Sequence, residues 1–368
     1  MSKIKNFLKN EAVLIISFIL AAASAFIIKP STDYIGYIDF RTLALLFCLM
    51  AVMAGFNKLG IFKTLASKLL SFASTSRNLC LTLSLLCFFS SMAITNDVAL
   101  ITFVPFSVII LNLSNKNHLL IPLVTLETIA ANLGSMLTPV GNPQNLYLFS
   151  SFEMKTAEFF KVLLPYATLS LILTVIFSLF IKKEKIEFSS ETNKEKADYK
   201  LCIIYSVLFI AALLTVFRII PFEITLAVSI AAVLIFDRKT LTKVDYSLLL
   251  TFTFLFIFIG NLKNIAPVSD FLHSIVNGNE VLVGVASSQI FSNVPAAILL
   301  SGFTKNAADL LIGVNLGGLG TLIASMASLI SFKYVIKEKV SAGRYILFFT
   351  AVNIIFLAFN LALWAAIK

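Results

Sequence analysis

Two short polar motifs interrupt apolar stretches of this 368-residue chain, and their residue types suit ion binding. The first is Thr95-Asn96-Asp97, with Ser91 five residues before Asn96, and the second is Ser292-Asn293-Val294-Pro295, with Ser288 five residues before Asn293. An asparagine side chain offers a carbonyl oxygen to a cation and amide hydrogens to an anion. If each motif forms the tip of a helical hairpin, the second limb begins with N–H groups that attract an anion. The alternative is that these residues only cap the second limb.

Two further stretches break apolar runs that would otherwise predict continuous helices. Residues 132–145 hold two glycines, two prolines and three asparagines, and residues 315–325 are similarly irregular. A break inside a bilayer exposes backbone N–H and C=O groups that protein or ligand must pair. One half-helix then ends with carbonyls available to a cation, and the next begins with N–H groups available to an anion. Gly313 and Gly317 form a GxxxG pattern, for which close helix packing is the favoured interpretation.

Two acidic residues, Asp97 and Glu127, lie well inside apolar segments. A charge there costs at least about 2.5–3.5 kcal/mol on insertion scales, so such residues are usually functional. Asp97 would repel a nearby anion unless a proton or a sodium ion neutralised it, which indicates coupling to H⁺ or Na⁺. For Glu127 two hypotheses stay open, proton coupling and a bond to a neighbouring helix.

Composition places the chain in a membrane. It is 59% hydrophobic and 13% charged, with a mean hydropathy of +0.95, whereas soluble domains carry about 25% charged residues. The net charge of +10 comes from basic residues spread over short loops, so we expect the lipid bilayer and no nucleic acid as a partner. No GxxxxGK[ST], HExxH or GxSxG motif appears. We therefore expect no enzyme activity, and no cofactor apart from Na⁺ or H⁺ as a coupling ion.

The apolar pattern predicts an all-α polytopic membrane protein with an internal repeat. Plain spans are expected at 12–28, 42–56, 161–181, 201–217, 222–236, 244–262 and 342–366. Residues 91–99 (SMAITNDVA) align with 288–296 (SQIFSNVPA), and Asn132-Leu133-Gly134 aligns with Asn315-Leu316-Gly317. Corresponding broken segments in two halves are the sequence sign of a secondary transporter's binding site.

Four regions follow from this repeat. They are an N-terminal transmembrane helix in 1–37, a first repeat at 38–181, a cytoplasmic linker at 182–200 and a second repeat at 201–366. The first repeat holds a re-entrant hairpin at 78–113 and a broken helix at 119–150; the second holds a hairpin at 281–304 and a broken helix at 306–332. Residues 1–28 resemble a signal peptide, but the apolar run continues past the small residues, which favours an uncleaved span.

The distribution of basic residues predicts the orientation. With the N-terminus inside and the C-terminus outside, the cytoplasmic loops hold 21 of the 29 Lys and Arg residues, in agreement with the positive-inside rule. The two repeats then have opposite orientations. We expect a multi-pass protein of the cytoplasmic membrane.

The two tips and the break GSMLTPVGNPQN (134–145) resemble the ion transporter superfamily. This superfamily includes citrate-transporter-like permeases, divalent anion:sodium symporters, arsenite permeases and a class of Na⁺/H⁺ antiporters. The resemblance extends from about residue 38 to 366. The Asn-Asp pair of the first tip is closer to arsenite permeases and antiporters, since dicarboxylate symporters have Ser-Asn-Thr there.

The resemblance implies an elevator mechanism, in which hairpins and broken helices move a ligand past a fixed and often dimeric scaffold, so a homodimer is expected. Carried over by position, one cation site comprises Ser91, Thr95, Asn96 and Gly141, and the other comprises Ser288, Asn293 and Ala324. The substrate would contact both tips (Thr95, Asn96, Asp97, Ser292, Asn293) and the breaks (Asn142, Pro143, Ser325).

We therefore predict a secondary active transporter of a small anion, such as a di- or tricarboxylate or an inorganic oxyanion, coupled to Na⁺ or H⁺. Because no Lys or Arg lies in either tip or break, helix N-termini and amides would hold the anion. A Na⁺/H⁺ antiporter or an arsenite-type permease is the closest alternative. A membrane scaffold or receptor that transports nothing is a more remote one.

Overall fold

The computed structural model describes residues 11–61, 75–185, 198–338 and 340–368. Within these ranges the chain is built from helices, and one isolated bridge between Thr75 and Lys185 is the strand-type pairing present. Most of the predicted linker at 182–200 lies outside the described residues.

Seven helices in the described part of the chain are long and apolar enough to cross a membrane. They are α4 (Phe40–Lys58), α6 (Ser76–Ile94), α7 (Asn96–Leu113), α10 (Thr156–Leu179), α11 (Tyr199–Val216), α13 (Tyr246–Lys263) and α19 (Ala342–Ile367). Two predicted spans are shorter, because α2 (Ala12–Ile27) has 16 residues and α12 (Phe222–Phe236) has 15, against about 20 for a perpendicular crossing. The predicted class, an all-α polytopic membrane protein, is confirmed.

The remaining helices are short and include the two broken regions. The first break separates α8 (Leu120–Ser135) from α9 (Pro143–Ser151), and the second separates α17 (Ala307–Leu316) from α18 (Met326–Val335). Between α13 and the second break lie α14 (Ala266–Val276), α15 (Glu280–Phe291) and α16 (Asn293–Ser301), and α3 (Asp33–Tyr37) precedes α4. Short 3-10 turns, η1 (Asn117–Leu119), η2 (Arg238–Lys243), η3 (Leu322–Ala324) and η4 (Ile336–Glu338), complete the described chain.

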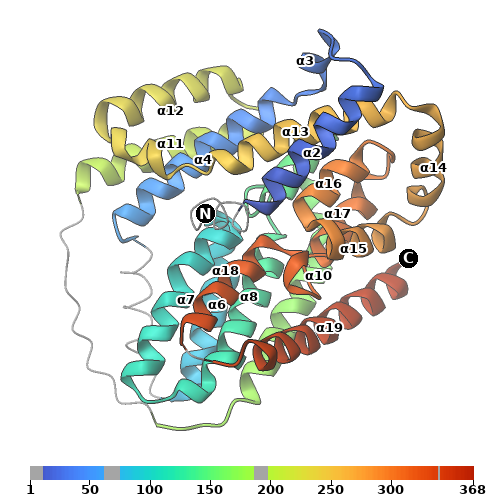
Figure 1. Cartoon of the computed structure of the whole chain (residues 1–368). Helices are drawn as coiled ribbons and strands as arrows, with labels where there is room; N and C mark the ends of the chain where they lie inside the picture. The colour runs from blue at the N-terminus through green and yellow to red at the C-terminus, as the bar shows by residue number, and fades with distance from the viewer. Residues whose placement is uncertain (1–10, 62–74, 186–197, 339) are drawn as a thin grey trace, which may run out of the picture.

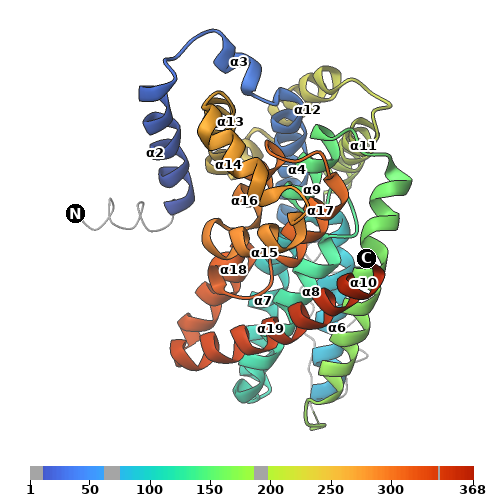
Figure 2. The ribbon, with the colours of Figure 1, turned by 90° about the vertical axis from the view of Figure 1, so that its right-hand side faces the viewer.

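The helices form two groups that meet along one interface (Figures 1 and 2). The frame group consists of α2, α4, α11, α12 and α13, which pack on one another. The hairpin group consists of α6 to α10 and α15 to α19. Contacts between the groups run chiefly through α9 against α4 and through α16 against α13. The frame group thus lies directly beside a helix of each half.

Helices α4 and α13 begin with the same local structure. Asp39 and Asp245 are the N-cap residues, with φ/ψ of −79°/85° and −81°/86°. Each carboxylate accepts a hydrogen bond of 2.9 Å from the backbone N–H three residues later, at Thr42 and Leu248. Capping of this kind satisfies N–H groups that a helix leaves unpaired.

Glycines let each hairpin approach a broken helix closely. A Cβ at Gly134 on α8 would lie 2.1 Å from the carbonyl oxygen of Phe88 on α6. At the corresponding Gly317, which follows α17, a Cβ would lie 2.4 Å from Oγ of Ser288 on α15. A Cβ at Gly313 would lie 2.7 Å from the carbonyl oxygen of Val281, so the packing interpretation of this GxxxG pattern agrees with the structure.

Candidate binding site at the hairpin tips and helix breaks

Each hairpin turns at a single residue with an unusual backbone. Thr95, between α6 and α7, has φ 70° and ψ 151°, and Ser292, between α15 and α16, has φ 71° and ψ 155°. Positive φ is rare in residues other than glycine, above all in a β-branched one such as threonine. Strain of this kind costs about 1–3 kcal/mol and clusters at functional sites. The two predicted tips therefore share one strained conformation.

The first tip is held against the first break. The backbone N–H of Asn96 donates to the carbonyl oxygen of Gly141 at 3.1 Å, and Thr138 Oγ1 donates to the carbonyl oxygen of Met92. Asn96 Oδ1 accepts from the N–H of Asp97 at 2.9 Å. The structure thus brings together Asn96 and Gly141, two members of the expected first cation site.

Side chains pair the backbone groups that the first break releases. Asn142 is the N-cap of α9, and its Oδ1 accepts from the N–H of Asn145 at 2.9 Å. Nδ2 of Asn145 donates to the carbonyl oxygens of Ser135, Met136 and Thr138 at 3.4, 2.9 and 3.1 Å. Asn145 therefore provides the internal pairing that a break inside a membrane needs.

Gln289 plays the same part at the second break. Its Nε2 donates to the carbonyl oxygens of Gly317 and Leu319 at 2.9 and 2.8 Å, and its Oε1 accepts from the N–H of Thr321 at 3.0 Å. Neither Asn145 nor Gln289 was among the site residues predicted from the sequence. The sequence signal that could have indicated them is a carboxamide side chain close to a helix break, where backbone N–H and C=O groups need hydrogen-bond partners.

The other predicted residues of the second half lie buried around its tip. Ser288, Ser292, Asn293, Ala324 and Ser325 are at most 4% exposed. The hydroxyls of Ser91 and Ser288 both donate to carbonyl oxygens of their own helices, at Phe88 (2.9 Å) and Gly284 (2.7 Å). The second tip is thus tightly enclosed by protein.

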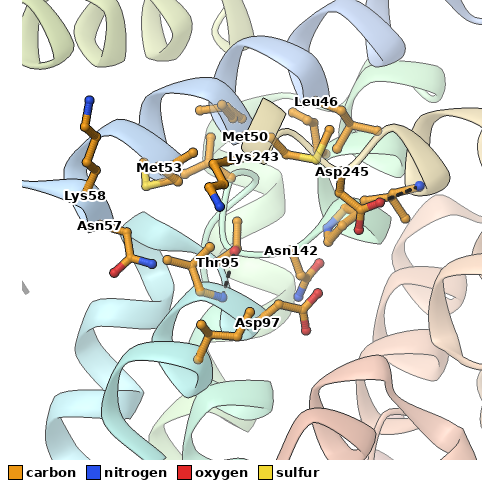
Figure 3. A pocket seen from close by; sticks show the side chains of 18 residues that line it. Leu46, Met50, Met53, Asn57, Lys58, Thr95, Asp97, Asn142, Lys243 and Asp245 are labelled. Carbon is orange, nitrogen blue, oxygen red and sulfur yellow. Dashed lines mark hydrogen bonds between the residues drawn. The ribbon is translucent and has the colours of Figure 1, made fainter. Parts of the chain in front are cut away.

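A cavity of about 660 Å³ opens beside the first tip (Figure 3). Four predicted residues line it, namely Thr95, Asp97, Asn142 and Pro143. The opposite wall comes from α4, from the end of η2 and from the start of α13, and its residues were not predicted from the sequence. Those with polar or sulfur-containing side chains are Met50, Met53, Asn57, Lys58, Lys243 and Asp245.

Charges of both signs line this cavity. Lys58 forms an ion pair of 2.7 Å with Asp237, and Asp245 caps α13. Burial raises the pKa of Asp237, but hydrogen bonds from Lys58, Thr240 and Tyr205 outweigh it and hold the pKa below its ordinary value. Within the described part of the chain Lys243 has no hydrogen-bond or ion-pair partner. Its ammonium group is therefore available to a ligand.

An aromatic cluster joins α9 to α13 and α16 elsewhere in the interface. The ring of Tyr147 on α9 lies 5.5 Å from Phe256 and 6.3 Å from Phe252 on α13 (centroid to centroid), and its hydroxyl lies 2.7 Å from Ser301 Oγ on α16. Beyond it, a second cavity of about 350 Å³ is lined by Tyr147, Phe256 and Lys263, among others. Tyr147 and Phe256 thus line the second cavity and not the larger one.

Two buried carboxyl groups lie apart from the large cavity. Glu127 on α8 is fully buried, and its Oε1 accepts from Ser107 Oγ at 2.5 Å, while Oε2 has no hydrogen-bond partner among the described residues. Glu280, which was not predicted from the sequence, is 1% exposed and accepts from Thr304 Oγ1 at 2.7 Å. Asp97 Oδ1 is also buried with no partner in the described part of the chain, but Asp97 faces the cavity.

The donor set is not that of a transition-metal centre. In the described ranges no three His, Cys, Asp or Glu residues are placed to hold a metal ion. Carbonyl, hydroxyl and carboxamide oxygens dominate both tips and both breaks, and such oxygens are the ligands of hard cations.

The proteins similar to this chain include transporters and an inner membrane protein. An uncharacterized transporter of Methanocaldococcus jannaschii is 38% identical over 325 residues, which cover 87% of this chain and 88% of that protein. The inner membrane protein YbiR of Escherichia coli K12 is 29% identical over 302 residues, 80% of each chain. A putative transporter arsB of Dictyostelium discoideum is 28% identical over 174 residues, 46% of this chain and 30% of that protein.

The family model described as citrate transporter matches residues 8–330. This match includes both tips, both breaks and the frame helices that line the cavity. The chain is therefore a multi-pass membrane protein that belongs to the citrate transporter family.

Proposed function

We propose that this protein is a secondary active transporter of a small anion, such as a di- or tricarboxylate or an inorganic oxyanion, coupled to Na⁺ or H⁺. One observation carries the proposal. The 660 Å³ cavity combines a strained hairpin tip, the N-terminus of a broken helix and an unpaired lysine. Its volume suits a small solute, because ligand pockets typically measure about 300–1,000 Å³.

The anion would bind between the start of α7 and Lys243. In this structure Asn96 Oδ1 and Thr95 Oγ1 accept from the N–H groups of Asp97 and Val98 at 2.9 and 3.5 Å. An anion at the helix N-terminus would replace these contacts with stronger, charge-assisted ones. Asn142 and Pro143, also in the cavity wall, would limit its size. In the second half, Ser292, Asn293 and Ser325 would form the corresponding surface.

Asp97 supplies the argument for a coupling ion. Its carboxylate faces the same cavity as the proposed anion, and the two charges repel each other unless a cation lies between them or a proton neutralises Asp97. We assign this cation to Ser91, Thr95, Asn96 and Gly141, with a second site at Ser288, Asn293 and Ala324. Glu127, which is buried with no cationic partner within the described ranges, is a second candidate for a transported proton.

We further propose an elevator movement of the hairpin group against the frame group. Both tips and both breaks belong to the hairpin group, whereas Lys58, Lys243 and Asp245 belong to the frame group or its adjoining turn. The cavity lies beside Lys58 and η2, in segments that the charge distribution assigns to the cytoplasm. On this proposal the cavity is the inward-open substrate site of a cytoplasmic-membrane transporter, and the frame group is the surface for a homodimer interface.

Reconstitution in liposomes tests the proposal. We expect uptake of at least one of citrate, succinate, sulfate and arsenite when a Na⁺ or pH gradient is imposed, and none when the gradient is dissipated. Asn96→Ala and Asn293→Ala should each reduce the rate at least about tenfold, because a tip amide is lost from the site. The absence of uptake of all four solutes under both gradients would refute the proposal.

A Na⁺/H⁺ antiporter is the second candidate. It is favoured by two carboxylates, Asp97 and Asp245, that line one cavity. Such a pair suits alternating Na⁺ and H⁺ binding. A pH-sensitive dye inside the liposomes distinguishes the two functions, since an antiporter moves protons on addition of Na⁺ without any anion substrate.

A further inference from the structure

Asn132, on α8 of the first half, lies in contact with the second break. Its Nδ2 donates to the carbonyl oxygen of Gly318 at 3.4 Å, and its Oδ1 accepts from Ser325 Oγ at 3.1 Å. The same Oδ1 accepts from Asn96 Nδ2 at 3.0 Å. One buried side chain therefore connects the first tip to both ends of the second break.

Asn315, on α17 of the second half, makes the reverse connection. Its Oδ1 accepts from Asn142 Nδ2 at 3.2 Å, and its Nδ2 donates to Asn145 Oδ1 at 2.7 Å. Its Nδ2 also donates to the carbonyl oxygen of Leu311 in its own helix at 2.8 Å. Asn142 and Asn145 are the residues that cap and re-pair the first break.

The two asparagines occupy equivalent positions, each two residues before the glycine at which a hairpin packs closely, Gly134 or Gly317. Each is at most 4% exposed. A carboxamide can donate twice and accept at both lone pairs, which lets one side chain join several segments. Substitution would leave the partner groups buried and unpaired, since no water or lipid can replace the lost bonds.

We propose that Asn132 and Asn315 are a reciprocal pair of positioning residues, each of which belongs to one half of the chain and holds the broken helix of the other half in its binding geometry. We call the tip and break of one half of the chain a half-site. The pair couples the two half-sites, because Asn96 and Ser325 share Asn132 as a partner while Asn142 and Asn145 share Asn315. Ion binding at the first tip therefore changes the order of the second break. The functional part of this inference rests on the proposed transport activity; the positional part does not.

Hydrogen–deuterium exchange of the full-length protein in detergent tests the positional part. Asn132→Ala should accelerate exchange roughly tenfold at residues 317–326, across the boundary between the halves, and at the first tip. Asn315→Ala should accelerate exchange at 138–146, across the same boundary in the opposite direction. Ser325→Ala, which removes a single bond to Asn132, is a milder variant for use if Asn132→Ala does not fold.

Asn360→Ala is the matched control. Asn360 is fully buried on α19 and bonds to Ser170 on α10 and to the carbonyl oxygen of Phe356, away from both breaks. This variant should accelerate exchange in α10 and α19 only. The proposal is wrong if Asn132→Ala or Ser325→Ala loosens only the first half, or if the changes match those of Asn360→Ala.

The functional part is tested by the Na⁺ or H⁺ dependence of uptake in liposomes. Asn132→Ala should lower the Hill coefficient for the coupling ion toward one, together with a rise in its half-saturating concentration, whereas Asn360→Ala should leave both unchanged. If the wild-type protein transports nothing, the proposed function fails and the exchange pattern still decides the positional part. If the wild type transports and Asn132→Ala retains its Hill coefficient, the coupling is refuted while the proposed function stands.

Discussion

The two half-sites share a backbone shape and differ in charge and access. Thr95 and Ser292 have nearly the same φ and ψ, yet Asp97 follows the first tip where Val294 follows the second. The limbs of the first hairpin have 19 and 18 residues, and those of the second have 12 and 9. The first tip opens to a cavity of about 660 Å³, whereas Val294 and Pro295 line one of only about 40 Å³. The two tips thus share a backbone conformation, but only the first has an acidic residue and a large adjoining cavity.

The two breaks solve the same physical problem with different residues. Asn145 re-pairs the first break from within α9, and Gln289 re-pairs the second from the hairpin limb α15. Both supply a carboxamide, because released backbone donors and acceptors inside a membrane need a side chain of both types. The two halves therefore use the same side-chain chemistry at the breaks, but from residues that do not correspond in the sequence repeat.

The largest expected effect comes from the two packing glycines. Gly134→Ala would place a Cβ 2.1 Å from a backbone oxygen of Phe88. Gly317→Ala would place a Cβ 2.4 Å from Oγ and 2.7 Å from Cβ of Ser288, with its nearest backbone atom, the carbonyl oxygen of Gly313, at 2.9 Å, so its clash with backbone is milder. Overpacking costs typically about 1–3 kcal/mol, and the contact with backbone lies at the upper end. Thermal unfolding should show a lower Tm for Gly134→Ala than for Gly317→Ala. Gly343→Ala, with no atom within 4 Å of the added Cβ, is the control; equal losses at positions 134 and 317 would contradict the difference between the halves.

The next comparison concerns charge at the tips. Asp97→Asn removes the acid from the first tip, and Val294→Thr makes a change of similar size at the second. We expect Asp97→Asn to reduce gradient-driven uptake at least about tenfold, since the coupling ion loses its counter-charge. Val294→Thr should change it less than about twofold. Uptake measured with and without the Na⁺ or pH gradient checks this, and retention of full coupling by Asp97→Asn would show that the acid is not the origin of the asymmetry.

A smaller effect is expected from the lysine of the frame wall. Lys243→Gln should raise the KM for the anion about three- to tenfold, with a smaller change at high ionic strength, because a charge at the cavity is lost. Lys239→Gln is the matched control, since Lys239 is exposed on the same turn η2 but does not line the cavity. Kinetics of uptake at two salt concentrations provide the measurement. Identical KM changes in the two variants would mean that Lys243 acts on the anion only through long-range electrostatic attraction and not by direct contact.

The smallest effect concerns an ion pair beside the first half. Glu184 lies 2.5 Å from Lys116 and 3.5 Å from His118, and the hydrogen bond from Lys116 holds the pKa of the Glu184 carboxyl below its ordinary value. A depressed pKa in the folded protein stabilises it at pH values above the unfolded pKa, about 4.3, and this contribution disappears as pH falls through the folded pKa. Glu184→Gln should therefore lower Tm by about 1–2 °C at pH 7. The difference should vanish in acid and in high salt; a difference that persists at pH 3 would exclude the ion pair as its cause.

Much of the fold was predictable because membrane insertion leaves a strong pattern in the sequence. Apolar runs place most of the helices, and polar residues inside such runs mark the tips at Thr95 and Ser292 and the breaks before Pro143 and Met326. The lengths of α2 and α12 were less predictable, since apolar composition continues past the point where a helix ends.

The contents of the site were only partly predictable. Residues chosen from the tips and the first break, including Thr95, Asp97 and Asn142, do line a cavity, but its opposite wall comes from α4 and from the segment around Lys243 and Asp245. These residues are ordinary loop and cap residues in the sequence. Which helix faces the tip depends on packing between distant segments, and no local pattern encodes it.

By itself, the sequence determined that the chain lies in a membrane, where its helices break, and that both halves carry the same motifs. Hydrocarbon imposes these features locally, because each unpaired backbone group must be compensated by nearby residues. The tertiary structure alone decided that Asn132 bonds to the second break and Asn315 to the first, and that a lysine of the frame wall faces the first tip. Such contacts join residues more than 140 positions apart, and they arise only when the two halves pack against each other.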